Sequence, residues 1–348
     1  MSFDENEANI PAVGLLNFSK IDQKIKYYKK KNNSNLNNAC YINSSIQCLF
    51  RLDEFVKSIL KCDGGSLTTA TQNLIRKMKN YNKKNNIICS VEEIKIAMGK
   101  ENNFYNGEEQ GDANEFISNY LNYLIEETKD TAKINWNCLP KDEKYFNIFK
   151  EKFLERKGNS FILDLFYGVL RKETYCKQCK FKAPLKFNSF NILEIPIYED
   201  EDNNCDENLE LYDLLNKFIS KKKIENDNCP KCQGNLSIKT SINTLPKCLI
   251  IYFSRDYSDG KKNKINIPKT INFEKFLFDA SLNNDREYFY HLKGIIFYSY
   301  YKKFISHYKA TCYVNNENWY YFNDNYCKKE KNLAICQDDN PVFLFYEK

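Results

Sequence analysis

One stretch of the chain decides its fold: Asn35-Leu-Asn-Asn-Ala-Cys40-Tyr-Ile-Asn43-Ser-Ser-Ile-Gln47-Cys-Leu-Phe50. Its first residues are polar and turn-forming, and from Cys40 to Leu60 apolar residues recur at a spacing that predicts a helix buried on one side. Cys40 therefore stands in the first turn of the predicted helix. Exposed N–H groups and the helix macrodipole stabilise a thiolate at that position, which makes Cys40 a candidate nucleophile.

Composition excludes several classes of protein. No stretch of the 348 residues approaches the roughly 20 apolar residues of a membrane span, and the acidic N-terminus (Asp4, Glu5, Glu7) does not resemble a signal peptide. We therefore expect an intracellular protein, in the cytoplasm or the nucleus, whose 14 cysteines are free thiols rather than a disulfide framework. The net charge of +6 is modest and the basic runs are short, so we expect a solvated surface with no nucleic-acid or membrane partner.

The pattern of apolar residues changes along the chain. A second helix is predicted from Ala113 to Glu127, and the first 155 residues or so read as mainly helical. From Phe161 onward, short runs rich in β-branched and aromatic residues predict strands, at 190–197, 248–253, 288–298 and 342–346. The chain thus reads as an α+β fold, with a helical part followed by a mostly antiparallel β part.

Four cysteines form two Cys-x-x-Cys pairs, Cys176/Cys179 and Cys229/Cys232. Two such pairs can build two tight turns that together give zinc four sulfur ligands. We therefore expect one structural zinc ion, with the two turns at the tips of neighbouring β excursions. Four protein ligands leave no open position for water, so no catalytic metal is expected. The alternative is a set of buried or redox-active cysteines.

A nucleophilic cysteine needs a base, and the chain has only two histidines, His291 and His307. His291 lies within an alternating strand, whereas His307 follows a polar, aromatic loop at the start of a strand-like run. Asn323 and Asp324 follow 16 and 17 residues after His307, where a hairpin returns them beside the imidazole to orient it. Asn35 is a candidate donor to the oxyanion.

These residues resemble the ubiquitin-specific proteases, a papain-like family of deubiquitinases. The stretch Asn35-Leu-Asn-Asn-Ala-Cys40-Tyr-Ile-Asn43-Ser-Ser-Ile-Gln47 is similar to the Cys box of that family. His307-Tyr-Lys-Ala310 and Trp319-Tyr-Tyr-Phe-Asn323-Asp324 are similar to its His box, and Gln110-Gly-Asp112-Ala-Asn-Glu115-Phe116 to the box between them.

The resemblance implies hydrolysis of isopeptide or peptide bonds after the C-terminal glycine of ubiquitin, through a thioester. Cys40 would be the nucleophile, His307 the base, Asn323 the orienting residue with Asp324 adjacent, and Asn35 the oxyanion donor. A further set of residues would line the channel for the ubiquitin tail: Gln110, Asp112, Glu115 and Tyr308. Ubiquitin and ubiquitinated proteins are the partners that the resemblance implies.

The resemblance also implies a papain-like architecture, with a helical thumb, a β palm and zinc-tipped β fingers. We expect an N-terminal extension over residues 1–33 and a catalytic domain over 34–347, with the thumb at about 34–160, the fingers at about 161–255 and the palm at about 256–347, fingers and palm being interleaved. Within the extension, Gly14-Leu-Leu-Asn17-Phe is similar to the opening of a Cys box, but Asp22 stands five residues after Asn17, so no nucleophile follows it.

The boxes also depart from the family pattern. Asn37, Ala39 and Ser306 replace Gly, Thr and Gly beside the two catalytic residues. These changes leave open a catalytically weak ubiquitin-binding protein. A second alternative is a papain-like protease for another ubiquitin-like modifier or for general peptides, which shares the Cys-His-Asn logic but leaves the acidic residues Asp112 and Glu115 unexplained.

Overall fold

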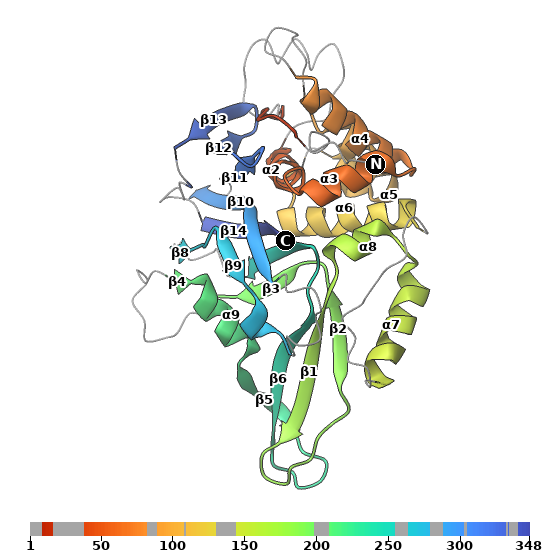
Figure 1. The fold of residues 1–348 in the computed structure, drawn as a ribbon, viewed down its shortest axis with the longest axis vertical. Coiled ribbons are helices and arrows are strands. Elements are labelled where there is room, and N and C mark those ends of the chain that lie inside the picture. The colour runs from red at the N-terminus through yellow and green to blue at the C-terminus, as the bar shows by residue number, and fades with distance from the viewer. Residues whose placement is uncertain are drawn as a thin grey trace.

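The computed structural model describes residues 9–16, 38–81, 89–107, 109–129, 144–197, 209–254, 264–278, 288–302, 305–331, 333 and 340–348. Most of the helices lie in one part of the molecule and the strands in another, as Figure 1 shows. Within the described residues, no helix is long and apolar enough to cross a membrane.

The N-terminal half is a helical lobe. Its helices are α2 (Cys40–Leu49), α3 (Asp53–Lys61), α4 (Ser66–Lys79), α5 (Glu92–Glu101), the 3₁₀ turn η2 (Asn103–Asn106), α6 (Ala113–Glu127), α7 (Lys144–Lys157) and α8 (Phe161–Phe166). The helix predicted over Ala113–Glu127 is confirmed at both ends. Its apolar residues at i, i+3 and i+4 are buried against α2, α4 and α8, which explains why this pattern predicted the helix so well.

The single helix predicted from Cys40 to Leu60 is wrong in one respect, because the chain turns between α2 and α3. The carboxylate of Glu347, near the end of the chain, accepts hydrogen bonds from the first N–H groups of α3, at Asp53 (3.1 Å) and Glu54 (2.9 Å). Lys293 Nζ lies 3.3 Å from the same carboxylate and 2.9 Å from Asp53 Oδ2. The capping carboxylate lies almost 300 residues further along the chain, so no nearby residue indicates that the helix breaks here.

The described residues of the C-terminal half form three sheets. The strands are β1 (Gly168–Cys176), β2 (Lys186–Phe190), β3 (Leu193–Pro196), β4 (Leu209–Glu210), β5 (Lys221–Asn228), β6 (Asn235–Thr244), β7 (Cys248–Ser254), β8 (Ile265–Asn266), β9 (Thr270–Asn272), β10 (Phe289–Lys302), β11 (Ile305–Val314), β12 (Asn318–Asn323), β13 (Tyr326–Glu330) and β14 (Asn340–Glu347). Two further helical elements, α9 (Leu211–Ile219) and the 3₁₀ turn η3 (Glu274–Phe276), interrupt them. The predicted α+β class is confirmed, although α8 and α9 lie in the part of the chain, from Phe161 onward, where the sequence pattern predicts strands.

The eight-stranded sheet has the order β13-β12-β11-β10-β14-β7-β3, with β9 paired to β10. Its pairs are antiparallel except for β3 with β7. The four-stranded sheet, in the order β2-β1-β6-β5, extends away from it as a long projection at the bottom of Figure 1. Because strands β3 and β7 of the large sheet flank the projection's β5 and β6 in sequence, the two sheets are interleaved along the chain.

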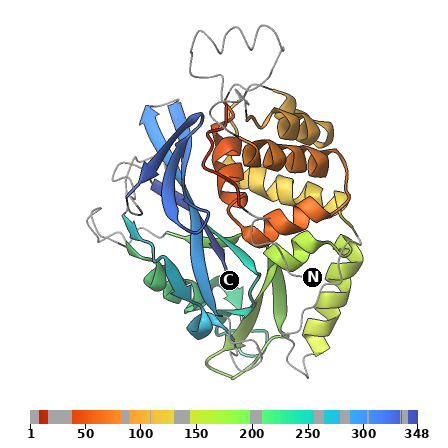
Figure 2. The same ribbon diagram turned by 45° about the horizontal axis from the view of Figure 1, so that its top comes forward.

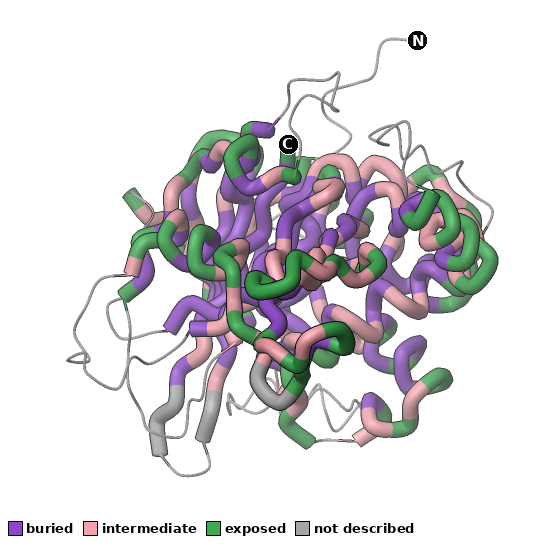
Figure 3. Tube along the Cα trace, turned by 90° about the horizontal axis from the view of Figure 1, so that it is seen from below, coloured by how far each residue is buried: buried purple, intermediate pink, exposed green. Residues whose placement is uncertain are grey.

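Helix α2 lies between the helical lobe and the large sheet, as Figure 2 shows. All ten of its residues are buried, and Figure 3 shows buried residues gathered in the interior of the molecule. The approach to the sheet is close: a Cβ on Gly294 of β10 would lie 2.8 Å from Cys48 Sγ and 3.4 Å from Cys48 Cα. These contacts leave no room for an added methyl group, so they fix the position of the helix on the sheet.

Residues 9–16, which fall within the predicted N-terminal extension, also belong to the interior. Ile10, Val13 and Leu15 are buried in the same apolar cluster as α2. In Figure 1 this segment is the red trace between α2 and the β12–β13 hairpin. The domain boundaries themselves stay a prediction, but the start of the chain is a structural neighbour of the nucleophile helix.

Candidate active site

Cys40 is the first residue of α2 and is 3% exposed. The turn that leads into the helix contains Asn38, whose φ of 54° lies in the left-handed region that asparagine tolerates better than most residues. The thiol therefore stands at the N-terminal end of a fully buried helix, where the positive end of the macrodipole favours its ionised form.

His307 lies on β11, the strand that packs against α2. Strand β12 pairs antiparallel with β11 and carries Asn323 back to the imidazole, where Nε2 lies 2.8 Å from Asn323 Oδ1. A carbonyl oxygen only accepts, so Nε2 carries the proton and donates it. Nδ1 is then the ring nitrogen left to act on a thiol, the arrangement that a cysteine nucleophile with a His base and an Asn partner requires.

Asp324 follows in the two-residue turn between β12 and β13. Its Oδ2 lies 3.8 Å from His307 Nε2, and its Oδ1 accepts a hydrogen bond of 3.0 Å from Asn43 Nδ2 on α2. Asn323 is thus the closer partner of the imidazole, and Asp324 supplies a carboxylate behind it that is tied to the nucleophile helix. The Asp324 side chain is 2% exposed, which strengthens these electrostatic contacts relative to water.

The sequence motif did not assign a role to Asn43. The signal that could have found it is a polar stripe at four-residue spacing, formed by Asn43 and Gln47 on α2 and by Arg51 in the turn after it. All three are buried. Buried polar side chains are hydrogen-bonded as a rule, so such a stripe predicts polar partners against that face.

The N-terminus of α6 packs beside Cys40. Tyr41 contacts the ring of Phe116 edge-on at 5.9 Å between centroids, and a Cβ on Gly111 would lie 2.5 Å from Tyr41 Cζ. Asp112 caps α6, accepting at Oδ1 from the N–H groups of Asn114 (2.7 Å) and Glu115 (3.0 Å). Gly111 is therefore required for close approach, and the box around it adjoins the nucleophile.

Asp112 also links α6 to the histidine strand. Its Oδ2 accepts a hydrogen bond of 3.1 Å from the hydroxyl of Tyr308, the residue after His307. Burial raises the pKa of Tyr308 well above its ordinary value, and the nearby Asp112 carboxylate raises it further, so the hydroxyl stays a donor. Asp112, Glu115 and Gln110 remain exposed, so the structure gathers them with Tyr308 on the accessible side of the site.

Two predicted positions lie outside the described residues. These are Asn35, the candidate oxyanion donor, and Asn37, one of the departures from the family pattern. Ala39, another departure, is fully buried beside Cys40.

The four paired cysteines meet at the far end of the four-stranded sheet. Cys176 is the last residue of β1, and Cys229 and Cys232 lie in the turn from β5 to β6. Strand β6 pairs with β1, which brings this turn beside Cys176. Both Cys-x-x-Cys turns have the same shape. The N–H of Cys176 binds the carbonyl of Phe181 and that of Cys229 binds the carbonyl of Gly234, each at 2.8 Å. In both, the residue after the second cysteine has a positive φ, 61° at Lys180 and 60° at Gln233.

The donor set fits a zinc ion. The four sulfur atoms lie within 4.8 Å of one another, and two of the separations, Cys176–Cys232 and Cys179–Cys229, are 3.6 and 3.5 Å. A tetrahedron with Zn–S bonds of about 2.3 Å has sulfur–sulfur edges of about 3.8 Å.

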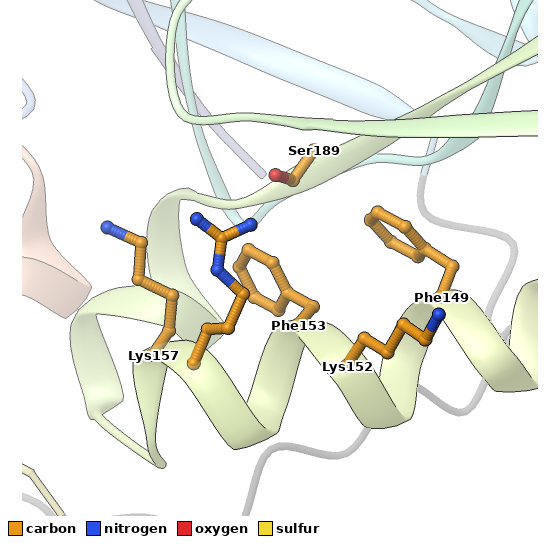
Figure 4. Close-up of a pocket in the computed structure, with 6 residues that line it drawn as sticks. Phe149, Lys152, Phe153, Lys157 and Ser189 are labelled. Carbon is orange, nitrogen blue, oxygen red and sulfur yellow. The ribbon is translucent and has the colours of Figure 1, made fainter.

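A separate cavity lies between α7 and β2, and Figure 4 shows it. It is lined by Phe149, Lys152, Phe153, Arg156, Lys157 and Ser189. None of these residues belongs to the predicted site, so this cavity is not the catalytic cleft.

The comparison with protein families decides the classification. The family described as ubiquitin carboxyl-terminal hydrolase matches residues 32–346. The chain belongs to this family. The family predicted from the boxes is therefore confirmed. The thumb, palm and fingers of the predicted papain-like architecture correspond to the helical lobe, the large sheet and the four-stranded sheet.

Similar hydrolases occur in animals and fungi. Ubiquitin carboxyl-terminal hydrolase Usp2 of Drosophila melanogaster is 26% identical over 90% of this chain and 34% of its own length. Ubiquitin carboxyl-terminal hydrolase 4 of Saccharomyces cerevisiae is 25% identical over 90% of this chain and 39% of its own, and human ubiquitin carboxyl-terminal hydrolase 2 is 26% identical over 90% and 54%. The chain thus spans between a third and about half of the length of these relatives.

Solved structures share the fold. A chain of the SAGA DUB module of Ubp8, Sgf11, Sus1 and Sgf73, bound to monoubiquitin, superposes with a TM-score of 0.69 at 17% identity, covering 99% of this chain and 70% of that one. The same module bound to ubiquitin aldehyde gives a TM-score of 0.67 at 18% identity, with the same coverage.

The contact between His307 and Asn323 yields a prediction. Replacing Asn323 with Ala removes the acceptor at Nε2, so the imidazole loses its fixed tautomer and we expect the rate of any reaction of Cys40 that uses this base to fall about 10- to 100-fold. Nitrogen NMR of the histidine rings measures the tautomer directly, and with two histidines in the chain the spectrum is simple.

His291, which contacts Thr270 Oγ1 at 3.1 Å, is the internal reference and should not change. Asn318→Ala, on the same strand and hydrogen-bonded at the surface to Glu317, is the matched control. A His307 signal that is the same in Asn323→Ala and wild type would contradict the assignment.

Proposed function

We propose that the chain is a cysteine-type deubiquitinase, which hydrolyses the peptide or isopeptide bond after the C-terminal glycine of ubiquitin. The observation that carries the proposal is the orientation of one imidazole. His307 lies on β11, the strand packed against the helix that starts at Cys40, and its Nε2 is 2.8 Å from Asn323 Oδ1. This contact leaves Nδ1 to act on the thiol. Membership of the family and the similarity to ubiquitin-bound modules supply the substrate class.

The reaction follows from these groups. His307 takes the proton of Cys40, and the sulfur attacks the carbonyl carbon of the terminal glycine to give a tetrahedral oxyanion. When this intermediate collapses, the C–N bond breaks, the imidazolium protonates the departing amine, and a thioester remains on Cys40. His307 then takes a proton from water, the hydroxide displaces the sulfur, and the thiol is restored by the imidazolium.

Oxyanion donors are proposed from the backbone at the start of α2 and from Asn35. N–H groups at a helix N-terminus suit an anion because the macrodipole adds to their hydrogen bonds. The Asn35 side chain is proposed on the strength of its place in the Cys box alone.

Substrate selection is proposed at the N-terminus of α6. Glu115 and Asp112 share one face of the helix, are exposed, and carry negative charge beside the catalytic strand. Carboxylates bind arginine through charge-assisted hydrogen bonds, and the C-terminal strand of ubiquitin carries arginines. Gln110 and the Tyr308 hydroxyl add polar contacts along the same path.

A panel of C-terminal electrophiles made from ubiquitin and from related modifiers tests the function. We expect wild-type protein to form a covalent adduct with the ubiquitin probe at least about tenfold faster than with the other probes, because the arginine–carboxylate contacts depend on the tail sequence. Adducts are followed by electrophoresis and mapped by peptide mass spectrometry to Cys40.

Cys40→Ala should form no adduct, whereas Cys62→Ala, which removes a partly exposed thiol, should react as wild type does. Ubiquitin binding without an adduct or turnover would instead identify a non-catalytic ubiquitin-binding protein. A preference for another modifier's probe would overturn the substrate assignment.

We also propose that Cys176, Cys179, Cys229 and Cys232 hold one structural zinc ion, which joins the ends of β1, β5 and β6. The purified protein should contain about one equivalent of zinc, and Cys229→Ser should lower this towards zero because three thiolates and a hydroxyl bind zinc far more weakly. Elemental analysis gives the metal content and thermal unfolding the stability. Cys62→Ser is the control that should retain the metal, and a zinc-free wild-type protein of full stability would refute the site.

A further inference from the structure

The segment of residues 9–16, named here the N-terminal strap, contacts both halves of the catalytic centre. It runs along the polar stripe formed by α2 and the turn after it. There, Gln47 Nε2 donates a hydrogen bond to the carbonyl of Val13 (2.6 Å), and Arg51 Nη1 donates one to the carbonyl of Ile10. The third member of the stripe, Asn43, donates from Nδ2 to the carbonyls of Leu15 and Leu16, at 3.4 Å each. The stripe therefore finds its polar partners in the backbone of the strap.

On its other side the strap contacts the turn that follows Asn323. The N–H of Leu15 donates to the carbonyl of Asp324 at 2.9 Å. At Gly14 the two backbones touch, since a Cβ there would lie 2.3 Å from the carbonyl oxygen of Asn325. At Leu16 the strap contacts the helical lobe, because the Leu16 N–H donates a hydrogen bond of 3.0 Å to the carbonyl of Cys89. Glycine is required at position 14 for this approach.

The turn needs such support. Asn323 pairs with Tyr326 across it, so Asp324 and Asn325 form a two-residue hairpin, and Asp324 has a φ of 55°. Glycine or asparagine adopts this conformation more readily than aspartate, so holding Asp324 there has a cost in stability. Two contacts offset this cost: the backbone hydrogen bond from Leu15 of the strap to Asp324, and the hydrogen bond from Asn43 of α2 to the Asp324 carboxylate.

Asn43 joins the strap to the catalytic carboxylate. The three groups that face its Nδ2 are the Leu15 and Leu16 carbonyls and Asp324 Oδ1, which only accept, so the amide must present its NH₂ group to all of them. The other oxygen of Asp324 lies 3.8 Å from His307 Nε2. A continuous chain of polar contacts thus runs from the strap to the imidazole.

We propose that the N-terminal strap is a positioning segment of the catalytic centre, which fixes the Asp324 turn so that Asn323 and Asp324 face His307. The proposal rests on the proposed function and names a part of that site which lies outside the matched family region, residues 32–346. It gives the resemblance of Gly14-Leu15-Leu16 to the opening of a Cys box a physical role. The segment contributes the glycine contact and the backbone bonds, while Cys40 follows after the intervening residues.

Gly14→Ala tests the proposal, because its Cβ overlaps backbone atoms of Asn325 that cannot rotate away. Displacing the turn by a fraction of an ångström moves Asn323 relative to His307, and we expect kcat for a ubiquitin–fluorophore substrate to fall about tenfold or more with KM changed less than about threefold. The rate at which iodoacetamide alkylates Cys40 is measured by peptide mass spectrometry across pH 5–9. In Gly14→Ala this rate should fall below pH 8, as kcat does.

The matched control is Gly107→Ala, where an added Cβ meets nothing closer than Phe104 O at 3.4 Å, and it should stay within about twofold of wild type. If Gly14→Ala does not reach the native near-UV circular dichroism spectrum, Asn43→Ala carries the test, because it cuts the link to Asp324 without adding atoms.

A variant with a lowered Tm but with wild-type kcat per folded molecule and an unchanged alkylation profile would overturn the proposal, leaving the strap a purely structural role. The alkylation measurement needs no ubiquitin. A wild-type protein that does not cleave ubiquitin would therefore refute the proposed function while the strap is still decided by the reactivity of Cys40.

Discussion

The burial of α2 between the helical lobe and the large sheet is the constraint on which the rest of the structure depends. A helix with all ten residues buried must satisfy its polar side chains and must fit its neighbours closely. Gly294 lets the sheet approach Cys48, and Gly111 lets the start of α6 approach Tyr41. Because both contacts fix the helix along its length, they also fix its first residue, Cys40, relative to strands β11 and β12.

The polar groups of the site are arranged across this junction in successive layers. His307 is oriented by Asn323, Asp324 stands behind both, and Asn43 returns the chain of contacts to α2. In parallel, Asp112 links the cap of α6 to the histidine strand through Tyr308. Each contact joins two elements far apart in sequence, so the geometry of the thiol and imidazole is a property of the whole fold rather than of one loop.

Much of this could be predicted from the sequence, because the deciding patterns are local. The apolar spacing of α6, the alternating strands and the Cys-x-x-Cys pairs each report a period or a spacing that one segment fixes by itself. The scarcity of histidine narrowed the base to two candidates, and the family boxes supplied the rest of the predicted site.

What the sequence did not reveal depends on partners that lie far along the chain. The start of α3 after the break is capped by Glu347, and Asn43, Gln47 and Arg51 each donate to a backbone carbonyl of residues 10–16. Spacing along the chain gives Gly14 no role, because no cysteine follows it at the distance that a Cys box requires. Contact in space with Asn325, not spacing along the chain, gives that glycine its use.

The central claim is that His307 activates Cys40, and the pH dependence of Cys40 alkylation in wild type and His307→Ala tests it most directly. The account predicts a wild-type rate that stays high well below pH 8, because the imidazole keeps the sulfur ionised, and a His307→Ala rate that rises only near the ordinary thiol pKa of about 8.5. Superimposable profiles for the two proteins would contradict it.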